Sequence, residues 1–168
     1  MKWILFTGTW RLTNTQVETD VRNAVRDVIG RGDGILTGGA TGVDYFAMDE
    51  ALKIQPDGSR LKVIIPAYLD YYIDDYRKNW CQSPITQKDI DNLEFILRRI
   101  KKLHPDGIAE MPYQTITQDH YFLRDSEEVK IADEVFAFQV NKSAGTQDTI
   151  DKAKAAGVPI AQHKQYSL

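Results

Sequence analysis

Two short loops combine glycine with small or hydroxyl residues at points where a helix is expected to begin. The first is Gly38, Gly39, Ala40, Thr41 and Gly42, and the second covers residues 141–146 with Ser143, Gly145 and Thr146. The N–H groups of a helix's first turn and the helix dipole attract phosphate or carboxylate groups. Each loop alone is either an anion-binding turn or a tight turn that binds nothing. Two such loops facing one crevice favour an anionic ligand.

The glycine spacing excludes two better-known phosphate loops. A P-loop ends in Gly-Lys-Ser/Thr, a sequence that this chain lacks. A dinucleotide fingerprint needs Gly-x-Gly-x-x-Gly, and Thr37 stands at its first position. No metal site is expected either, because His104, His120 and His163 are spread along the chain without ligand spacing. Each is interpreted as a surface or capping histidine, and no cofactor is predicted.

The elements that would position these loops follow a strand and helix alternation. Apolar runs predict strands at residues 2–7, 35–37, 61–65, 134–140 and 158–161, with helical patterns between them. This order is typical of a parallel sheet with right-handed crossovers. Gly8, Thr9, Trp10 and Arg11 then form a further wall, in the loop after the first strand. Capping boxes are expected at Thr15 with Glu18 and at Thr41 with Asp44.

Two segments interrupt the alternation. Residues 67–84 interleave aromatic with charged side chains, which predicts either a lid that stacks a base or a short helix that packs its aromatics on the domain. Residues 105–123 show little periodicity, which predicts an irregular insertion that is functional or docked on a partner subunit.

Composition limits the classes of protein. A chain of 168 residues with 42% hydrophobic residues suits one globular domain, residues 1–168. The net charge of −3 argues against the class of nucleic-acid-binding proteins that are basic over their whole length. The single Cys81 excludes an internal disulfide framework and suits a reducing compartment. The apolar run after Lys2 is too short for a signal peptide and nothing approaches a membrane span, so we expect a cytoplasmic protein.

Both glycine motifs, an arginine between them and the strand at 134–140 resemble the SLOG superfamily. The matching stretches are residues 37–44, Arg124, Ala132 with Asp133, and residues 143–146. The superfamily includes the DNA-processing protein DprA, the LOG phosphoribohydrolases and small stand-alone domains proposed to sense nucleotide-derived ligands. The resemblance implies an α/β fold, a Rossmann-like three-layer αβα sandwich with a mainly parallel sheet of about five strands. It also implies a homo-oligomer.

The resemblance carries over residue by residue. Residues 38–42 are similar to the family's first phosphate-binding loop, although Thr41 stands where DprA and many stand-alone members have arginine. Arg124 lies eight residues before Ala132, and the resemblance places the arginine of LOG active sites at the same spacing. Arg124 is therefore the candidate for a phosphate or ribose contact. A guanidinium suits bidentate phosphate binding. The alternative is an ion pair between Arg124 and a nearby acid.

The last loop departs from the LOG pattern. LOG enzymes carry a glutamate that takes part in breaking the N-glycosidic bond, and Thr149 stands at its position here. A threonine cannot supply a carboxylate to that reaction. DNA processing of the DprA type is disfavoured by the acidic net charge and by Thr41.

These observations leave three hypotheses. The first is binding or sensing of a nucleotide or nucleotide-derived ligand, with Trp10 or a tyrosine against the base. The second is an N-glycosidic-bond hydrolase or transferase of the LOG or deoxyribosyltransferase type, with Asp44, Asp125 or Asp148 as the carboxylate. The third is a structural or DprA-like module that binds single-stranded nucleic acid. No membrane partner is expected, and whether the protein is an enzyme stays open.

Overall fold

The computed structural model describes residues 1–168 and contains one parallel sheet. Its strands are β1 (Trp3–Gly8), β2 (Gly34–Thr37), β3 (Leu61–Ile65), β4 (Ile108–Glu110), β5 (Glu134–Val140) and β6 (Ile160–Tyr166). Their order across the sheet is β4-β3-β2-β1-β5-β6, and every neighbouring pair is parallel. The expected α/β sandwich is confirmed, with six strands in place of about five.

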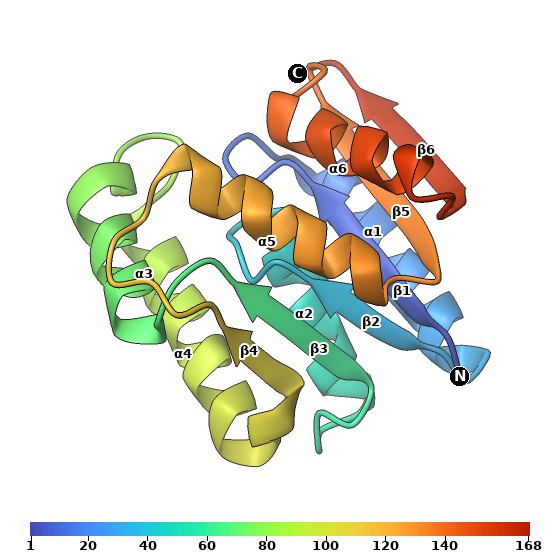
Figure 1. Ribbon diagram of the computed structural model, residues 1–168, viewed down its shortest axis with the longest axis horizontal. Helices are drawn as coiled ribbons and strands as arrows, with labels where there is room; N and C mark the ends of the chain where they lie inside the picture. The colour runs from blue at the N-terminus through green and yellow to red at the C-terminus, as the bar shows by residue number, and fades with distance from the viewer.

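Helices cover both faces of this sheet (Figure 1). They are α1 (Thr15–Gly30), α2 (Val43–Ile54), α3 (Leu69–Asp75), α4 (Gln87–Leu103), α5 (Gln118–Ile131) and α6 (Ala144–Ala155). The α5 and α6 helices pack on one face, and α1, α2 and α4 on the other. No helix is long and apolar enough to cross a membrane.

Successive side chains along a strand pack into two separate hydrophobic cores, one on each face of the sheet. In β1, Ile4 and Phe6 join the large core beneath α1 and α2, whereas Leu5 joins the smaller core beneath α5 and α6. Successive side chains of a strand point to opposite faces, so a strand covered on both sides reads as a continuous apolar run. This explains why the central strands were predictable from the sequence.

The elements beside the apolar runs differ from expectation. The segment expected to be irregular, residues 105–123, contains β4 and the first part of α5, which begins at Gln118. The short β4 carries only three residues, too few for a visible alternation, and the last strand is β6 at Ile160–Tyr166, later than predicted. Asn14 caps α1 in place of Thr15, since Asn14 Oδ1 accepts from the Val17 amide at 2.9 Å.

The aromatic segment forms a short helix packed on the domain, the second of its two expected forms. The α3 helix continues into one π-helical turn, Tyr76–Trp80, and both Tyr72 and Tyr76 are buried. Their hydroxyls reach the first glycine turn, where Tyr72 donates to the Gly39 carbonyl at 3.0 Å and Tyr76 accepts from the Thr41 amide at 3.1 Å. The segment therefore supports that turn.

Candidate functional site

A cavity of about 400 Å³ lies at the carboxyl ends of the central strands. Because β1 pairs with both β2 and β5, the loops after these three strands meet at one edge of the sheet. The α5 helix supplies another wall, since Arg124 and Asp125 line the same cavity. Most of the predicted binding residues line it: Gly8, Thr9, Trp10, Gly38, Ala40, Asp44, Arg124, Ser143, Gly145 and Thr146.

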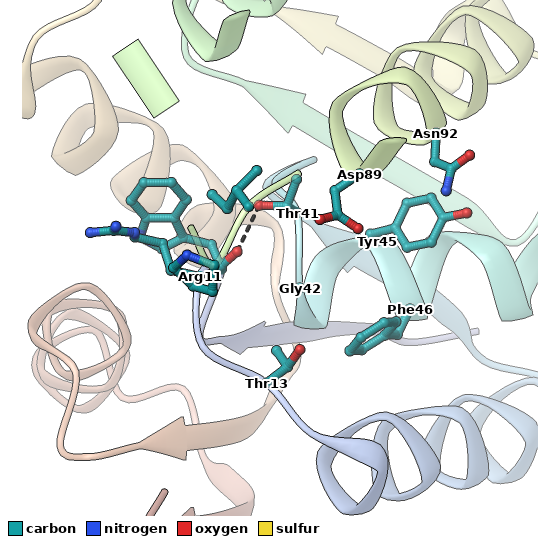
Figure 2. A pocket seen from close by; sticks show the side chains of 11 residues that line it. Arg11, Thr13, Thr41, Gly42, Tyr45, Phe46, Asp89 and Asn92 are labelled. Atoms are coloured by element: carbon teal, nitrogen blue, oxygen red, sulfur yellow. Dashed lines mark hydrogen bonds between the residues drawn. The ribbon is translucent and has the colours of Figure 1, made fainter. Parts of the chain in front are cut away.

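Four predicted residues do not line this cavity. Gly39 is enclosed by the core, and Thr41 and Gly42 line a neighbouring cavity of about 110 Å³ that Trp10 and Arg11 also border (Figure 2). There the Thr41 hydroxyl donates to the Trp10 carbonyl at 2.7 Å, which joins the first glycine turn to the loop after β1. Asp148 is turned toward Lys152, with 2.6 Å between Asp148 Oδ2 and Lys152 Nζ.

Arg124 is held by protein groups within the cavity wall. Its Nη1 donates to the Gly38 carbonyl at 2.9 Å, and its Nε and Nη2 donate to Asp125 Oδ1 at 3.2 and 3.1 Å. The Glu128 carboxyl lies one helical turn on, 4.0 Å from Arg124 Nε. The ion pair expected as the alternative role of Arg124 is therefore present, and a ligand that binds the guanidinium has to share it with these carboxyls.

Buried acids surround the guanidinium. Burial raises the pKa of Asp44 to about 6, even though Arg124 opposes the shift. Burial likewise raises the pKa of Asp125, and it raises the pKa of Glu128 well above its usual range. Three carboxyls with one arginine make this part of the cavity a poor place for a phosphate, because each added negative charge is desolvated beside others.

Glu128 is the site residue that sequence reasoning missed. It is 3% exposed, lines the cavity, and its Oε1 is buried without a hydrogen-bond partner. The signal was its position four residues after Arg124, which places both side chains on one face of a helix.

Three consecutive amides of the first glycine turn are already bonded inside the protein. Gly39 donates to Thr37 Oγ1 at 3.0 Å, Ala40 to Asp44 Oδ2 at 3.1 Å and Thr41 to the Tyr76 hydroxyl. The expected Thr41 and Asp44 capping box is thus absent; Gly42 is the N-cap of α2 and makes no side-chain cap. The Asp44 carboxyl thus accepts the Ala40 hydrogen bond that an anionic ligand would otherwise accept.

The second turn is arranged differently. The amides of Ala144, Gly145 and Thr146 donate to no acceptor within the chain, whereas the flanking Ser143 and Gln147 amides bond to backbone carbonyls. The Ser143 hydroxyl donates to Thr146 Oγ1 at 2.8 Å, so two hydroxyls stand beside these amides. This turn opens the α6 helix and borders the same cavity.

Aromatic rings form the remaining wall. Trp10 and Trp80 meet edge to face with ring centroids 4.8 Å apart, and the Arg11 guanidinium lies 5.7 Å from each ring. Tyr121 packs against Arg124, whose guanidinium carbon is 5.5 Å from the ring centroid. A flat ligand group can stack on such rings whatever its hydrogen-bonding pattern.

No cluster of three or more histidine, cysteine, aspartate or glutamate side chains is arranged to hold a metal ion. His120 stacks on Tyr113 with ring centroids 4.0 Å apart, and the His163 Nε2 lies 2.9 Å from Gln139 Oε1. His104 is the C-cap residue of α4.

No protein-family model and no curated protein matches the chain, but solved structures do. DNA processing protein A (DprA) from Helicobacter pylori, described for its single-stranded DNA binding mode, superposes with a TM-score of 0.66 at 20% identity over 95% of this chain and 63% of its own. DprA from Streptococcus pneumoniae superposes with a TM-score of 0.59 at 17% identity, and the match covers 99% of this chain and 50% of the DprA chain.

A third structure, TM1055, gives a TM-score of 0.52 at 14% identity over 98% of this chain and 77% of its own. The chain spans between half and two thirds of the two DprA chains, so what those whole proteins do does not transfer with the fold. The chain has the Rossmann-like fold of the DprA/LOG-like SLOG domains that its two glycine motifs resemble.

Proposed function

We propose that this domain binds a nucleotide or nucleotide-derived ligand, with phosphate at the start of α6. The observation that carries the proposal is the set of amides at Ala144, Gly145 and Thr146, which have no acceptor in the protein and border the 400 Å³ cavity. Amides at a helix N-terminus stabilise phosphate through hydrogen bonds and the helix dipole. The first glycine turn shapes the opposite wall.

The size and lining of the cavity support this ligand class. Small-molecule sites of about 300–1,000 Å³ combine apolar walls with a few polar groups. Here Trp10, Trp80 and Tyr121 offer faces for a base, while the polar groups gather at α5 and α6. The ligand therefore lies across the ends of β1 and β5.

A thermal-shift screen tests the proposal. The purified protein is melted with nucleoside mono-, di- and triphosphates, ADP-ribose, NAD and cyclic nucleotides. A ligand at 100 times its dissociation constant stabilises by about 2.7 kcal/mol, which raises the melting temperature measurably. If none of these compounds shifts the melt, the proposal is contradicted. An oligodeoxynucleotide arm then tests binding of single-stranded DNA.

Gly145→Glu locates the phosphate. A side chain added at Gly145 meets no atom within 4 Å, and an acid in the first turn of a helix is favourable. The variant is expected to fold normally and to lose ligand binding, because its carboxylate competes for the free amides. Gly30→Glu, which also meets nothing within 4 Å but lies outside the cavity, is the matched control and keeps binding.

A second candidate function is cleavage or transfer at an N-glycosidic bond. It is favoured by Asp44, whose pKa is raised by burial to about 6 and which lines the cavity, since a general acid works best with a pKa near the operating pH. The test is a turnover assay with the ligand from the screen. Asp44→Asn and Asp125→Asn abolish turnover with binding retained if the domain is such an enzyme, and no turnover in the parent protein contradicts it.

A further inference from the structure

One carboxyl oxygen of Glu128, in the wall of the cavity, has no hydrogen-bond partner in the protein. Glu128 Oε1 is the one buried side-chain polar atom in the structure without a hydrogen-bond partner. Native proteins leave few such atoms, because a buried polar group without a partner is costly. Glu128 lines the cavity, so a bound molecule can supply what the protein does not.

The surroundings hold this oxygen in place. A Cβ at Gly38 would stand 2.8 Å from Glu128 Oε1 and 2.6 Å from Arg124 Cζ, so the absent side chain at Gly38 is what gives both groups their room. Asp125, on the same helix, accepts both Arg124 bonds at Oδ1, and burial together with the neighbouring Asp148 carboxyl raises its pKa. Two carboxyls of α5, one of them with an unpartnered oxygen, thus line one cavity side by side.

The charges decide which ligand group fits there. An anionic group would meet three carboxyls, Asp44, Asp125 and Glu128, and a cationic group would meet the Arg124 guanidinium at their centre. An uncharged hydroxyl meets neither repulsion. It both donates and accepts, so it pairs with a carboxyl in either protonation state.

We infer that Glu128 and Asp125 bind the ring hydroxyls of a ribose, so that the cavity selects ribonucleotide-type ligands over their deoxy counterparts. The inference rests on the proposed function, because the phosphate at α6 is what brings the sugar between α6 and α5. Neighbouring hydroxyls of ribose present two donors side by side, as two carboxyls present two acceptors. A deoxyribose strand lacks one member of this pair.

The experiment is a titration by calorimetry of nucleoside 5′-monophosphates, each in its ribo, 2′-deoxy and 3′-deoxy form. Leaving a buried polar group without its partner typically costs about tenfold in affinity or more, so at least one deoxy form is expected to bind about tenfold more weakly. In Glu128→Met the preference falls to within about threefold, because a methionine side chain of similar length has no group that hydrogen-bonds a hydroxyl as the carboxyl does. Glu127→Met is the control: Glu127 is on the same helix, pairs with Lys130 and lies outside the cavity.

Equal affinity of the parent protein for ribo and both deoxy forms overturns the inference and leaves the proposed function standing. A preference that survives unchanged in Glu128→Met also overturns it, because another group then contacts the sugar hydroxyls. If no monophosphate of any form binds, the proposed function has failed and the inference with it. Where Glu128→Met does not fold, the comparison of ribo and deoxy forms on the parent protein still tests the inference.

Discussion

The two turns at the ligand edge of the sheet look alike in sequence and differ in what they offer a ligand. In the turn after β2 the Gly39, Ala40 and Thr41 amides bond to protein acceptors. In the turn after β5 the three amides at the start of α6 bond to none. In the glycine-rich turn, the three central amides are therefore not available to a ligand.

The glycines of the first turn serve packing. Gly42 has φ of +72°, and a Cβ there would stand 2.9 Å from Trp10 Cα. Gly38 gives room to Arg124 and Glu128, whereas Gly145 in the second turn faces open space. The glycines of a turn therefore indicate where backbone and side chains pack closely. Amides without an acceptor in the protein indicate where an anion can bind.

The largest effect is expected from Arg124→Met. Removing the cation leaves Asp125 and Glu128 buried without their partner and removes the bond to the Gly38 carbonyl. Breaking a buried pair on one side typically costs about 3–5 kcal/mol of folding stability. Urea denaturation measures it, with the exposed Arg99→Met as a control that changes stability by less than about 0.5 kcal/mol. A loss below about 1 kcal/mol would mean that Arg124 is not part of the first turn's support.

Gly42→Ala tests the packing role of the first turn directly. A positive φ and a close approach to backbone atoms act together, so we expect a loss of about 3 kcal/mol. Gly145→Ala is expected to change stability by less than about 0.5 kcal/mol, because nothing lies near its added methyl group. Similar losses in chemical denaturation would show that the two turns do not differ as described.

The sequence was sufficient for the parts of the fold that are buried on both sides. The strands β1, β3 and β5 could be predicted because each is an apolar run. The three-residue β4 could not be predicted, because it is too short for a pattern.

The sequence predicted which loops line the candidate site. It did not predict the hydrogen bonds and ion pairs within the site. Sequence spacing brought residues of the loops after β1, β2 and β5 to one cavity together with Arg124. It could not reveal which amides find acceptors, because Tyr76 reaches the first turn from a distant segment. Sequence reasoning also missed Glu128. The room for its carboxyl in the cavity wall depends on the absent side chain of Gly38, which lies ninety positions earlier in the loop after β2.

The pH dependence of stability separates Asp44 from the other acids of the cavity, Asp125 and Glu128. Since its folded-state pKa of about 6 exceeds the ordinary value of 3.8, the protonated carboxyl favours the folded state. This contribution is full below about pH 4 and is lost as the pH rises through 6, a change of about 2–3 kcal/mol. Asp44→Asn cannot ionise, so the stability of the parent protein relative to this variant falls by that amount between pH 4 and pH 7.5. A difference that stays constant across this range contradicts the burial of an ionisable Asp44.

The smallest effect is expected from Asp148→Asn, which probes the open turn from the outside. Asp148 lies on α6 with 27% of its side chain exposed and pairs with Lys152 one turn on. A pair of this kind contributes about 0.5 kcal/mol or less, and Lys152 keeps its bond to the Phe122 carbonyl at 2.7 Å. Asp148 does not line the cavity, so the affinity for the ligand found in the screen is expected to stay within about twofold of the parent protein. A large loss of affinity in the same titration would place Asp148 at the ligand, and the free amides of α6 would then have an acidic neighbour that weakens their hold on phosphate.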